Sequence, residues 1–180
     1  MEARYALIPD KEVFELHSEQ LDAARLGPSQ ALVRAETTMV SAGTELAAFT
    51  ALSKNVYIPG RWNSYPWRPG YGLVGRIAAL GPGEPKLQVG QRVFCFGKHA
   101  SLQVYDYSGS KPMNGIFPIP DDVDAVSAAV ARMALIGFTA PQLSGVEAGD
   151  TVAVFGLGLV GCLAAQLYQL AGARVIALDT

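Results

Sequence analysis

The chain has 180 residues, of which half are hydrophobic and 17% are charged, enough for one large domain or two small ones with a substantial apolar core. Its formal net charge of −2 gives no reason to expect a nucleic-acid partner. The N-terminus lacks the basic and apolar regions of a signal peptide, and no uninterrupted apolar stretch is long enough to span a membrane, so no membrane partner is expected.

Short apolar or alternating segments, punctuated by glycine and proline, predict a β domain over about the first 120 residues. The expected strands are residues 3–9, 13–16, 30–38, 72–79 and 91–96, followed by 101–105 and 115–119. Between them, residues 55–70 hold three prolines, two tryptophans and two tyrosines, which predicts a covering loop. Its rings either face a flat, apolar substrate or only seal the edge of the β domain.

The character of the sequence changes after Pro120. An alanine-rich segment, residues 123–138, predicts a helix with Asp124 near its start, and Thr139 begins a further helical turn that ends near Ser144. We place the domain transition within residues 121–145, with helix rather than a linker across it. The predicted domains are residues 1–125 and 126–180.

The last thirty residues read as a βαβ unit. Residues 151–155 form a short apolar run typical of a buried parallel strand, and G-x-G-x-x-G follows at once at 156–161. Residues 159–170 predict a helix that ends at Gly172, and residues 174–178 predict a second strand. Asp179 comes twenty-one positions after Gly158.

This spacing predicts a nucleotide site. Gly156 allows the tight strand-to-helix turn, Gly158 lets the backbone approach a pyrophosphate, and Gly161 lets helix and strand pack closely. Leu159 and Val160 stand in the first helical turn, whose unpaired N–H groups face the phosphates. An acid such as Asp179 accepts hydrogen bonds from a ribose and repels a 2′-phosphate, which favours NAD(H) over NADP(H). The alternative is a glycine-rich turn in another kind of βαβ protein.

Five segments resemble, in order, motifs of the medium-chain dehydrogenase/reductase superfamily. Residues 42–45 (Ala-Gly-Thr-Glu) are similar to its C-G-T-D element, and residues 69–75 (Pro-Gly-Tyr-Gly-Leu-Val-Gly) to P-G-H-E-x-x-G. Residues 90–93 (Gly-Gln-Arg-Val) resemble G-D-R-V, residues 137–140 (Gly-Phe-Thr-Ala) a helix segment before the nucleotide fold, and residues 156–161 the cofactor loop.

The resemblance implies a mixed β and α/β fold, in which a GroES-like, partly open β barrel precedes the first βαβ of a Rossmann fold. It implies an NAD(P)-dependent oxidoreductase that transfers a hydride between nicotinamide and an alcohol or carbonyl, or an activated double bond, of a small molecule. It also places Thr139 on the cofactor side. Complete members often form homodimers, which the resemblance implies for a complete form of this protein.

The positions that bind catalytic zinc in this superfamily are changed. They are Ala42, Tyr71 and Gly72 here, whereas zinc needs thiolate, imidazole or carboxylate donors. Cys95 and His99 stand at C-x3-H, which by itself makes no site, so we expect a core thiol and a loop imidazole. The resemblance therefore implies the zinc-independent branch. Two cysteines without a disulfide framework favour a cytoplasmic protein.

Without zinc, hydrogen bonds must polarise the substrate, and the resemblance offers two candidates. Thr44 matches a hydroxyl that relays a proton, so it would donate to a substrate oxygen or to the nicotinamide ribose; alternatively it only satisfies a turn. Tyr71 replaces the zinc-binding histidine and would serve as donor or acid to an alkoxide or enolate, or else only as an aromatic wall. Glu45 matches an acid with a structural role.

The sequence ends after the second strand of the βαβ unit, so only the adenosine side of a cofactor seat is encoded. We expect a fragment of a complete dehydrogenase that is inactive by itself. The alternative is a natural short protein that binds a nucleotide or a partner without redox chemistry.

Overall fold

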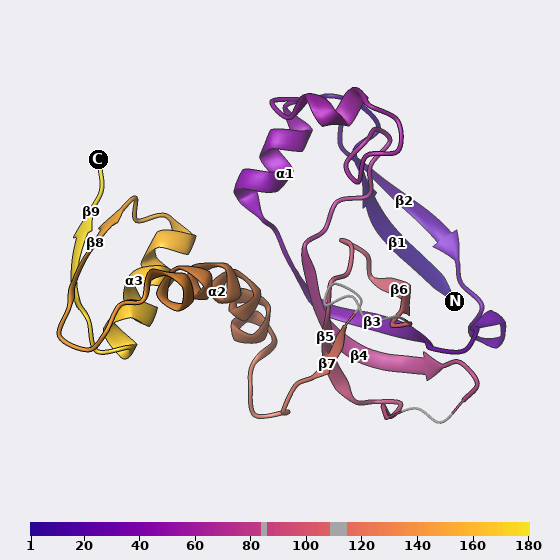
Figure 1. Ribbon diagram of the computed structural model, residues 1–180. Coiled ribbons are helices and arrows are strands. Elements are labelled where there is room, and N and C mark those ends of the chain that lie inside the picture. Colours follow the sequence, from indigo (N-terminus) through magenta and orange to yellow (C-terminus); the bar gives the residue numbers. More distant parts are fainter. Residues whose placement is uncertain (84–85, 109–114) are drawn as a thin grey trace. The chain divides into compact units, whose positions relative to one another are not determined.

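A computed structural model describes residues 1–83, 86–108 and 115–180 of the chain. These residues form two compact units, Met1–Ala129 and Val130–Thr180, each described by itself below (Figure 1). The division falls inside a helix, whereas the sequence analysis divides the chain after residue 125.

The first unit is built on a five-stranded antiparallel sheet with the order β6-β3-β4-β5-β7. Its strands are β3 (Gln30–Met39), β4 (Gly72–Leu80), β5 (Arg92–Cys95), β6 (Leu102–Asp106) and β7 (Ile116–Pro118). A separate hairpin pairs β1 (Glu2–Leu7) with β2 (Glu15–Gln20). Isolated bridges join Tyr5 to Ala100 and Ile8 to Trp67, and the described strands do not close into a barrel. The predicted mixed β and α/β fold class is confirmed.

The core of this unit is formed by apolar residues that alternate with more exposed ones along the central strands. Val33, Leu73, Ile77, Val93 and Cys95 are all fully or almost fully buried in one cluster. The prediction was wrong for β2, which begins at Glu15 and not at residue 13. Five of its six residues are exposed, so no apolar alternation marks the strand in the sequence.

Residues 42–49 form a helix, α1 (Ala42–Phe49), where the sequence analysis expected only turn chemistry. The helix is short and contains Gly43, so helix propensity does not predict it. It is stabilised by tertiary packing of Ala48 against Ile8 and Trp67, in a cluster that also includes the 3-10 turn η2 (Lys54–Tyr57). Figure 1 shows α1 and η2 beside the turn that joins β1 to β2, where the Glu12 N–H donates to the Phe49 carbonyl (2.8 Å).

The helix α2 (Ala125–Ser144) is continuous, although the sequence analysis expected two helical segments. Pro141 lies in its last turn, where the loss of one N–H donor interrupts little. Asp124 begins the helix by accepting hydrogen bonds from the N–H groups of Val126 (3.0 Å) and Ser127 (2.9 Å). By length and composition α2 would be able to cross a membrane, but Ala128 and Ala129 pack in a core cluster of the first unit.

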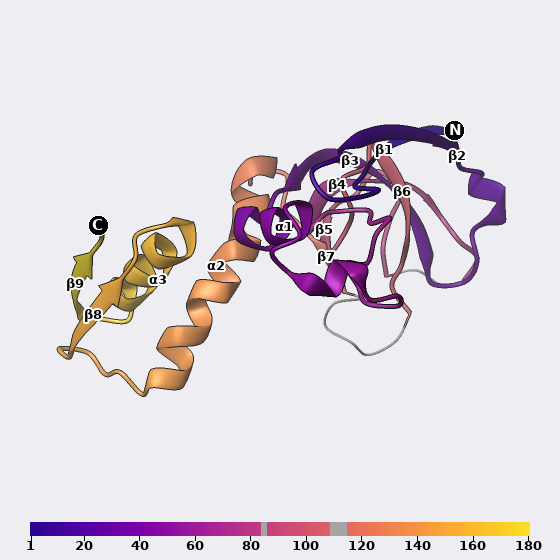
Figure 2. The same ribbon diagram turned by 90° about the horizontal axis from the view of Figure 1, so that it is seen from above.

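The second unit contains a βαβ unit. Strands β8 (Thr151–Phe155) and β9 (Arg174–Leu178) pair in parallel, and α3 (Leu159–Leu170) connects them. The three predicted elements have the observed bounds. Figure 2 shows α3 along one face of the two strands. The C-terminal end of β8 therefore meets the N-terminal end of α3, which is where a nucleotide phosphate is bound in folds of this kind.

Candidate functional site

The glycine loop between β8 and α3 has three different steric environments. Gly156 has φ +89°, a region that favours glycine. A Cβ at Gly161 would stand 1.9 Å from the Gly156 carbonyl oxygen, so only glycine lets α3 approach the loop this closely. A Cβ at Gly158 would meet nothing within 4 Å. Gly158 therefore leaves an open space at the start of α3 that the packing of the protein does not require.

Asp179 stands at the end of β9 beside this loop. Its Oδ2 accepts a hydrogen bond from the Leu157 N–H (2.8 Å), and its Oδ1 accepts one from Thr180 (2.8 Å). These bonds, that from Leu157 first, lower the pKa of the exposed carboxyl below its ordinary value. A fixed negative charge is thus held at the edge of the glycine loop.

Two further positions predicted for the cofactor side lie in the first turn of α3, Leu159 and Val160. Thr139 lies on α2, where its hydroxyl donates to the Leu135 carbonyl (3.4 Å). Two residues earlier, Gly137 faces α3, since a Cβ there would stand 3.1 Å from the Ala164 nitrogen. Thr139 is therefore close in sequence to the place where α2 meets α3, and its contact with a cofactor stays a prediction.

A second cluster lies in the β domain and consists of Thr38, Glu45 and His99; we call it the His99 cluster. His99 Nδ1 lies 2.8 Å from Thr38 Oγ1, and Nε2 lies 2.8 Å from Glu45 Oε2. Both side chains of this contact are largely buried, His99 at 15% and Glu45 at 10% exposure. An ionised carboxylate only accepts, so Nε2 donates to Glu45 and, in the neutral ring, Nδ1 accepts from the Thr38 hydroxyl. The expected loop imidazole is therefore part of a buried polar network, which the sequence analysis missed.

The His99 cluster ties three segments together. Glu45 Oε1 accepts the Ser41 N–H (2.8 Å), which anchors the start of α1. The His99 N–H donates to the Pro69 carbonyl (2.9 Å), and Gly70, at φ +138°, comes so close that a Cβ would stand 2.3 Å from Lys98 Cα. Thr44 is adjacent to Glu45, and Tyr71 follows Gly70. The fold thus brings the segments of both predicted catalytic residues to the same buried network.

The residues at the zinc positions do not fit a zinc ion. Ala42 is exposed and has no donor atom, and Gly72 is a buried strand residue without a side chain. Cys95 is fully buried in the core, and burial raises the pKa of its thiol to about 12, so the thiolate that zinc needs is disfavoured. Within residues 1–83, 86–108 and 115–180 no group of three His, Cys, Asp or Glu could hold a metal.

The aromatic loop divides its rings between the core and the surface. Trp67 is buried and makes an edge-to-face contact with Trp62 (5.6 Å between ring centroids), and the Tyr65 hydroxyl donates to the Ala48 carbonyl of α1. Tyr57 and Trp62 are exposed. Half of this loop therefore seals the domain, and the other half remains available to a ligand.

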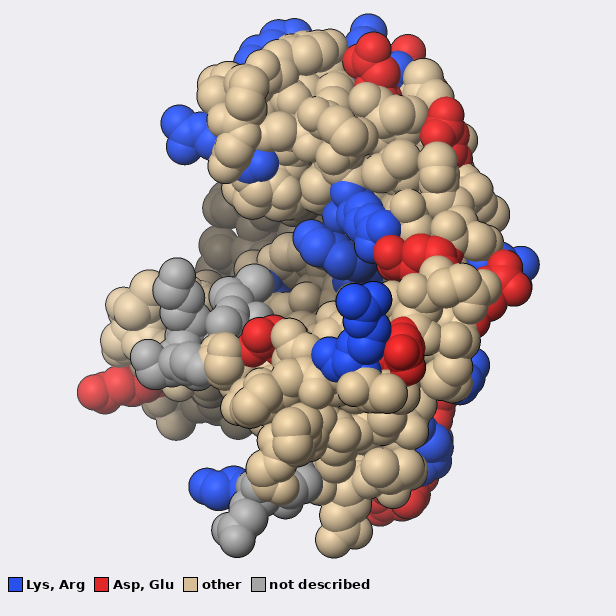
Figure 3. Space-filling view, turned by 90° about the vertical axis from the view of Figure 1, so that its right-hand side faces the viewer, with Lys and Arg blue, Asp and Glu red and all other residues tan. Residues whose placement is uncertain are grey.

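A cavity of about 590 Å³ opens beside Thr38 and His99. Its wall includes the exposed apolar side chains of Phe14, Leu16 and Val40. Figure 3 shows a face on which Lys and Arg side chains lie next to Asp and Glu side chains. On this face basic side chains are therefore interspersed with neighbouring acidic ones.

No family model matches the chain. Among curated proteins, it is 28% identical over 179 residues to the alcohol dehydrogenase notN of Aspergillus sp. (strain MF297-2), covering 85% of this chain and 50% of that protein. It is 25% identical over 203 residues to the L-threonine 3-dehydrogenase of Stenotrophomonas maltophilia, covering 94% and 55%. The chain thus spans about half the length of these relatives.

Solved structures share its fold at lower identity. The CurF ER cyclopropanase of the curacin A biosynthetic pathway matches with a TM-score of 0.82 at 20% identity, over 99% of this chain and 54% of that one. The 2R,3R-butanediol dehydrogenase of Bacillus subtilis matches with a TM-score of 0.76 at 17% identity, over 98% and 63%.

An antiparallel β domain followed by a βαβ unit with a glycine loop and a terminal acid is an arrangement that is also found in dinucleotide-binding oxidoreductases. The relatives in sequence are dehydrogenases, and the structures that share the fold include dehydrogenases as well. In sequence the chain is thus similar to alcohol and threonine dehydrogenases, and it shares its fold with the solved structures named above.

Proposed function

We propose that the chain provides the substrate domain and the adenosine half of the cofactor seat of a zinc-independent, NAD(H)-dependent oxidoreductase. The observation that carries the proposal is the glycine loop, in which Gly161 is required by packing and Gly158 is not, beside the fixed charge of Asp179. The reaction is hydride transfer between nicotinamide and an alcohol or carbonyl, or an activated double bond. The small, apolar substrate would occupy the β domain.

The residues present fit NAD(H). Gly156, Gly158 and Gly161 with the first N–H groups of α3 would hold the pyrophosphate, and Asp179 would hold the adenosine ribose. When bound, NAD(H) supplies or accepts the hydride. The 2′-phosphate of NADP(H) would meet the carboxylate of Asp179, which is the reason for the NAD(H) preference.

The residues of the β domain would handle the substrate oxygen. Thr44 and Tyr71 offer hydroxyl groups that would donate to a carbonyl oxygen or stabilise an alkoxide in place of a metal. The His99 cluster holds the segments that carry them, because Glu45 binds the start of α1 and the His99 backbone binds residue 69. We assign the cluster a positioning role.

The nucleotide assignment is tested by calorimetric titration of the 180-residue chain with ADP-ribose and with 2′-phospho-ADP-ribose. We expect ADP-ribose to bind at least about tenfold more tightly, because the extra phosphate is repelled by Asp179. In the variant Asp179→Asn, which keeps an acceptor for the Leu157 N–H, this ratio should fall. Equal affinities in the unaltered chain would show that the NAD(H) preference is wrong, and no binding of either ligand would reject the nucleotide site itself.

Metal content provides a separate test. After expression in zinc-supplemented medium and dialysis against a chelator, we expect less than about 0.1 equivalent of zinc per chain, because the positions that bind catalytic zinc in the superfamily offer no suitable donor set. Elemental analysis by mass spectrometry measures it. One tightly held equivalent would contradict the proposed zinc independence.

A further inference from the structure

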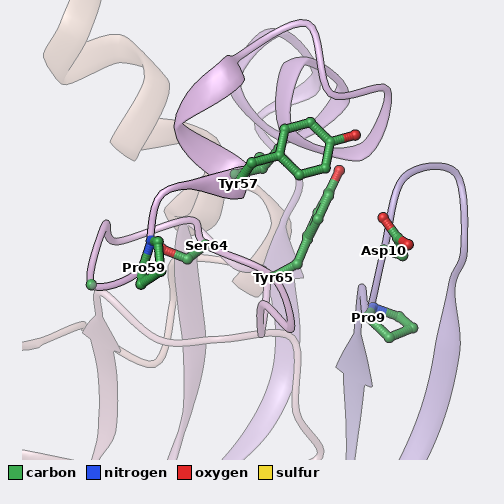
Figure 4. A pocket seen from close by; sticks show the side chains of 8 residues that line it. Pro9, Asp10, Tyr57, Pro59, Ser64 and Tyr65 are labelled. Carbon is green, nitrogen blue, oxygen red and sulfur yellow. The ribbon is translucent and has the colours of Figure 1, made fainter.

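A cavity of about 490 Å³ lies on the β domain between the turn after β1 and residues 56–65. Figure 4 shows it with Tyr57 and Tyr65 on one side and Asp10 on the other. Pro9 and Pro59 also line it. Thr44, Tyr71, the residues at the zinc positions and the His99 cluster do not line it, so these parts of the proposed redox site do not explain it.

The walls of this cavity are held by hydrogen bonds on both sides. Ile8 and Trp67 exchange two backbone hydrogen bonds of 2.8 Å, which join the end of β1 to the aromatic loop. The Tyr65 N–H donates to the Val56 carbonyl (2.9 Å), and its hydroxyl donates to the Ala48 carbonyl of α1. The Tyr65 ring is therefore fixed before any ligand arrives, which lowers the ordering cost of binding.

Two aromatic faces meet in the cavity. The rings of Tyr57 and Tyr65 lie 5.7 Å apart at 85°, so one ring presents its edge to the other and their faces point in different directions. Tyr57 is 55% exposed, which leaves part of its ring open to solvent and to a ligand. The faces of aromatic rings carry partial negative charge and attract cations.

The charged residue that lines the cavity is acidic. Asp10 lines it, and no Lys or Arg is among the lining residues that the structure describes. The nearby Lys11 pairs with Glu12 (3.8 Å). The pKa of Tyr65 is raised by burial first and then by the charges of Tyr57, Asp10 and Glu12, which shows that a further negative charge is disfavoured here. Of these causes, only the negative charges of Asp10 and Glu12 favour a positive charge, because burial disfavours a charge of either sign.

We propose that this cavity, lined by Tyr57, Tyr65 and Asp10, binds the methylated ammonium group of a small organic cation. The aromatic faces would contact the methyl groups, the two prolines would bound them, and the Asp10 carboxylate would balance the charge. An anionic ligand would face Asp10 without a basic partner, and a purely neutral apolar ligand would leave the carboxylate desolvated without compensation.

The test uses the 180-residue chain and a matched pair of probes, choline and its uncharged isostere 3,3-dimethylbutan-1-ol. Binding is followed by ¹H–¹⁵N NMR, with the amides of Gly60 and Ser64 as reporters at the cavity. We expect choline to shift these amides saturably and to bind at least about tenfold more tightly than the isostere. Equal affinity of the two probes, or no saturable shift with choline, would overturn the proposal.

Three variants separate the charge from the rings. Asp10→Asn keeps an oxygen for the Lys11 N–H that Asp10 Oδ1 now accepts (2.6 Å), and should weaken choline binding several-fold. Tyr57→Leu should weaken it similarly, whereas Tyr57→Phe, which keeps the ring, should not. Asp122→Asn, an exposed acid outside the cavity lining, is the charge control. Unchanged choline affinity in both Asp10→Asn and Tyr57→Leu would refute the assignment, whatever the outcome of the ADP-ribose titration.

Discussion

Replacing Glu45 by alanine is expected to lower the free energy of unfolding of the β domain by about 3 kcal/mol, because it leaves two buried partners without an acceptor. Those partners are the imidazole Nε2 of His99 and the N–H of Ser41. Both tryptophans, Trp62 and Trp67, lie in this domain, so urea unfolding followed by tryptophan fluorescence reports on it selectively.

Two control variants make the result specific. Glu45→Gln keeps one carbonyl oxygen in the same place and should lose clearly less stability than Glu45→Ala. Glu2→Ala removes an exposed acid from β1 and should stay within about 0.5 kcal/mol of the unaltered chain. If Glu45→Ala were as stable as Glu2→Ala, the His99 cluster would not hold α1 to the segment of residues 69–71, and its positioning role would be lost with it.

Alanine substitutions at Gly161 and at Gly158 are expected to have opposite effects. The first should lower stability, and the second should lower the affinity for ADP-ribose. In Gly161→Ala the new methyl group would stand 1.9 Å from the Gly156 carbonyl oxygen, so α3 must move away from the loop. We expect a loss of about 2–3 kcal/mol in the stability of the second unit, typical of overpacking against the backbone. Circular dichroism during thermal unfolding measures it.

In Gly158→Ala the methyl group meets no protein atom within 4 Å, and the residue has φ −63°, which alanine adopts without strain. Stability should therefore be unchanged or slightly higher, but ADP-ribose should bind at least about tenfold more weakly, because the methyl group occupies the space of the pyrophosphate. A Gly158→Ala variant that binds ADP-ribose normally would contradict the phosphate assignment. Gly149→Ala would be an unsuitable control, since Gly149 has φ +95°.

The contrast between the loop and the His99 cluster shows which parts of a site can be predicted from sequence. The loop is continuous in the sequence, and each glycine acts on a neighbour a few residues away, so its spacing was sufficient to predict the three elements of the βαβ unit. The His99 cluster joins residues 38, 45 and 99, which come from the end of β3, from α1 and from the loop between β5 and β6. No local pattern predicts it. The available signal was that the sequence contains Glu45, in the segment that resembles C-G-T-D, and His99, shortly after β5.

The helix α1 illustrates the same limit. Its residues contain glycine and follow a serine, which is ordinary turn chemistry, and the packing of Ala48 against Ile8 and Trp67 makes it helical. The strand β2 was misplaced for a related reason. Its register is decided by pairing with β1 and not by its own mostly exposed side chains.

The sequence by itself therefore determined the fold class, the βαβ unit with its glycine loop and acid, and the loss of the zinc donors at residues 42, 71 and 72. These features depend on residue type and on short spacing, which steric and coordination chemistry make informative. Only the tertiary structure decided that Thr38, Glu45 and His99 form one buried network, and that Asp10 faces Tyr57 and Tyr65 across a cavity (Figure 4). Both arrangements bring together residues far apart in the chain, and their position is set by the packing of the β domain as a whole.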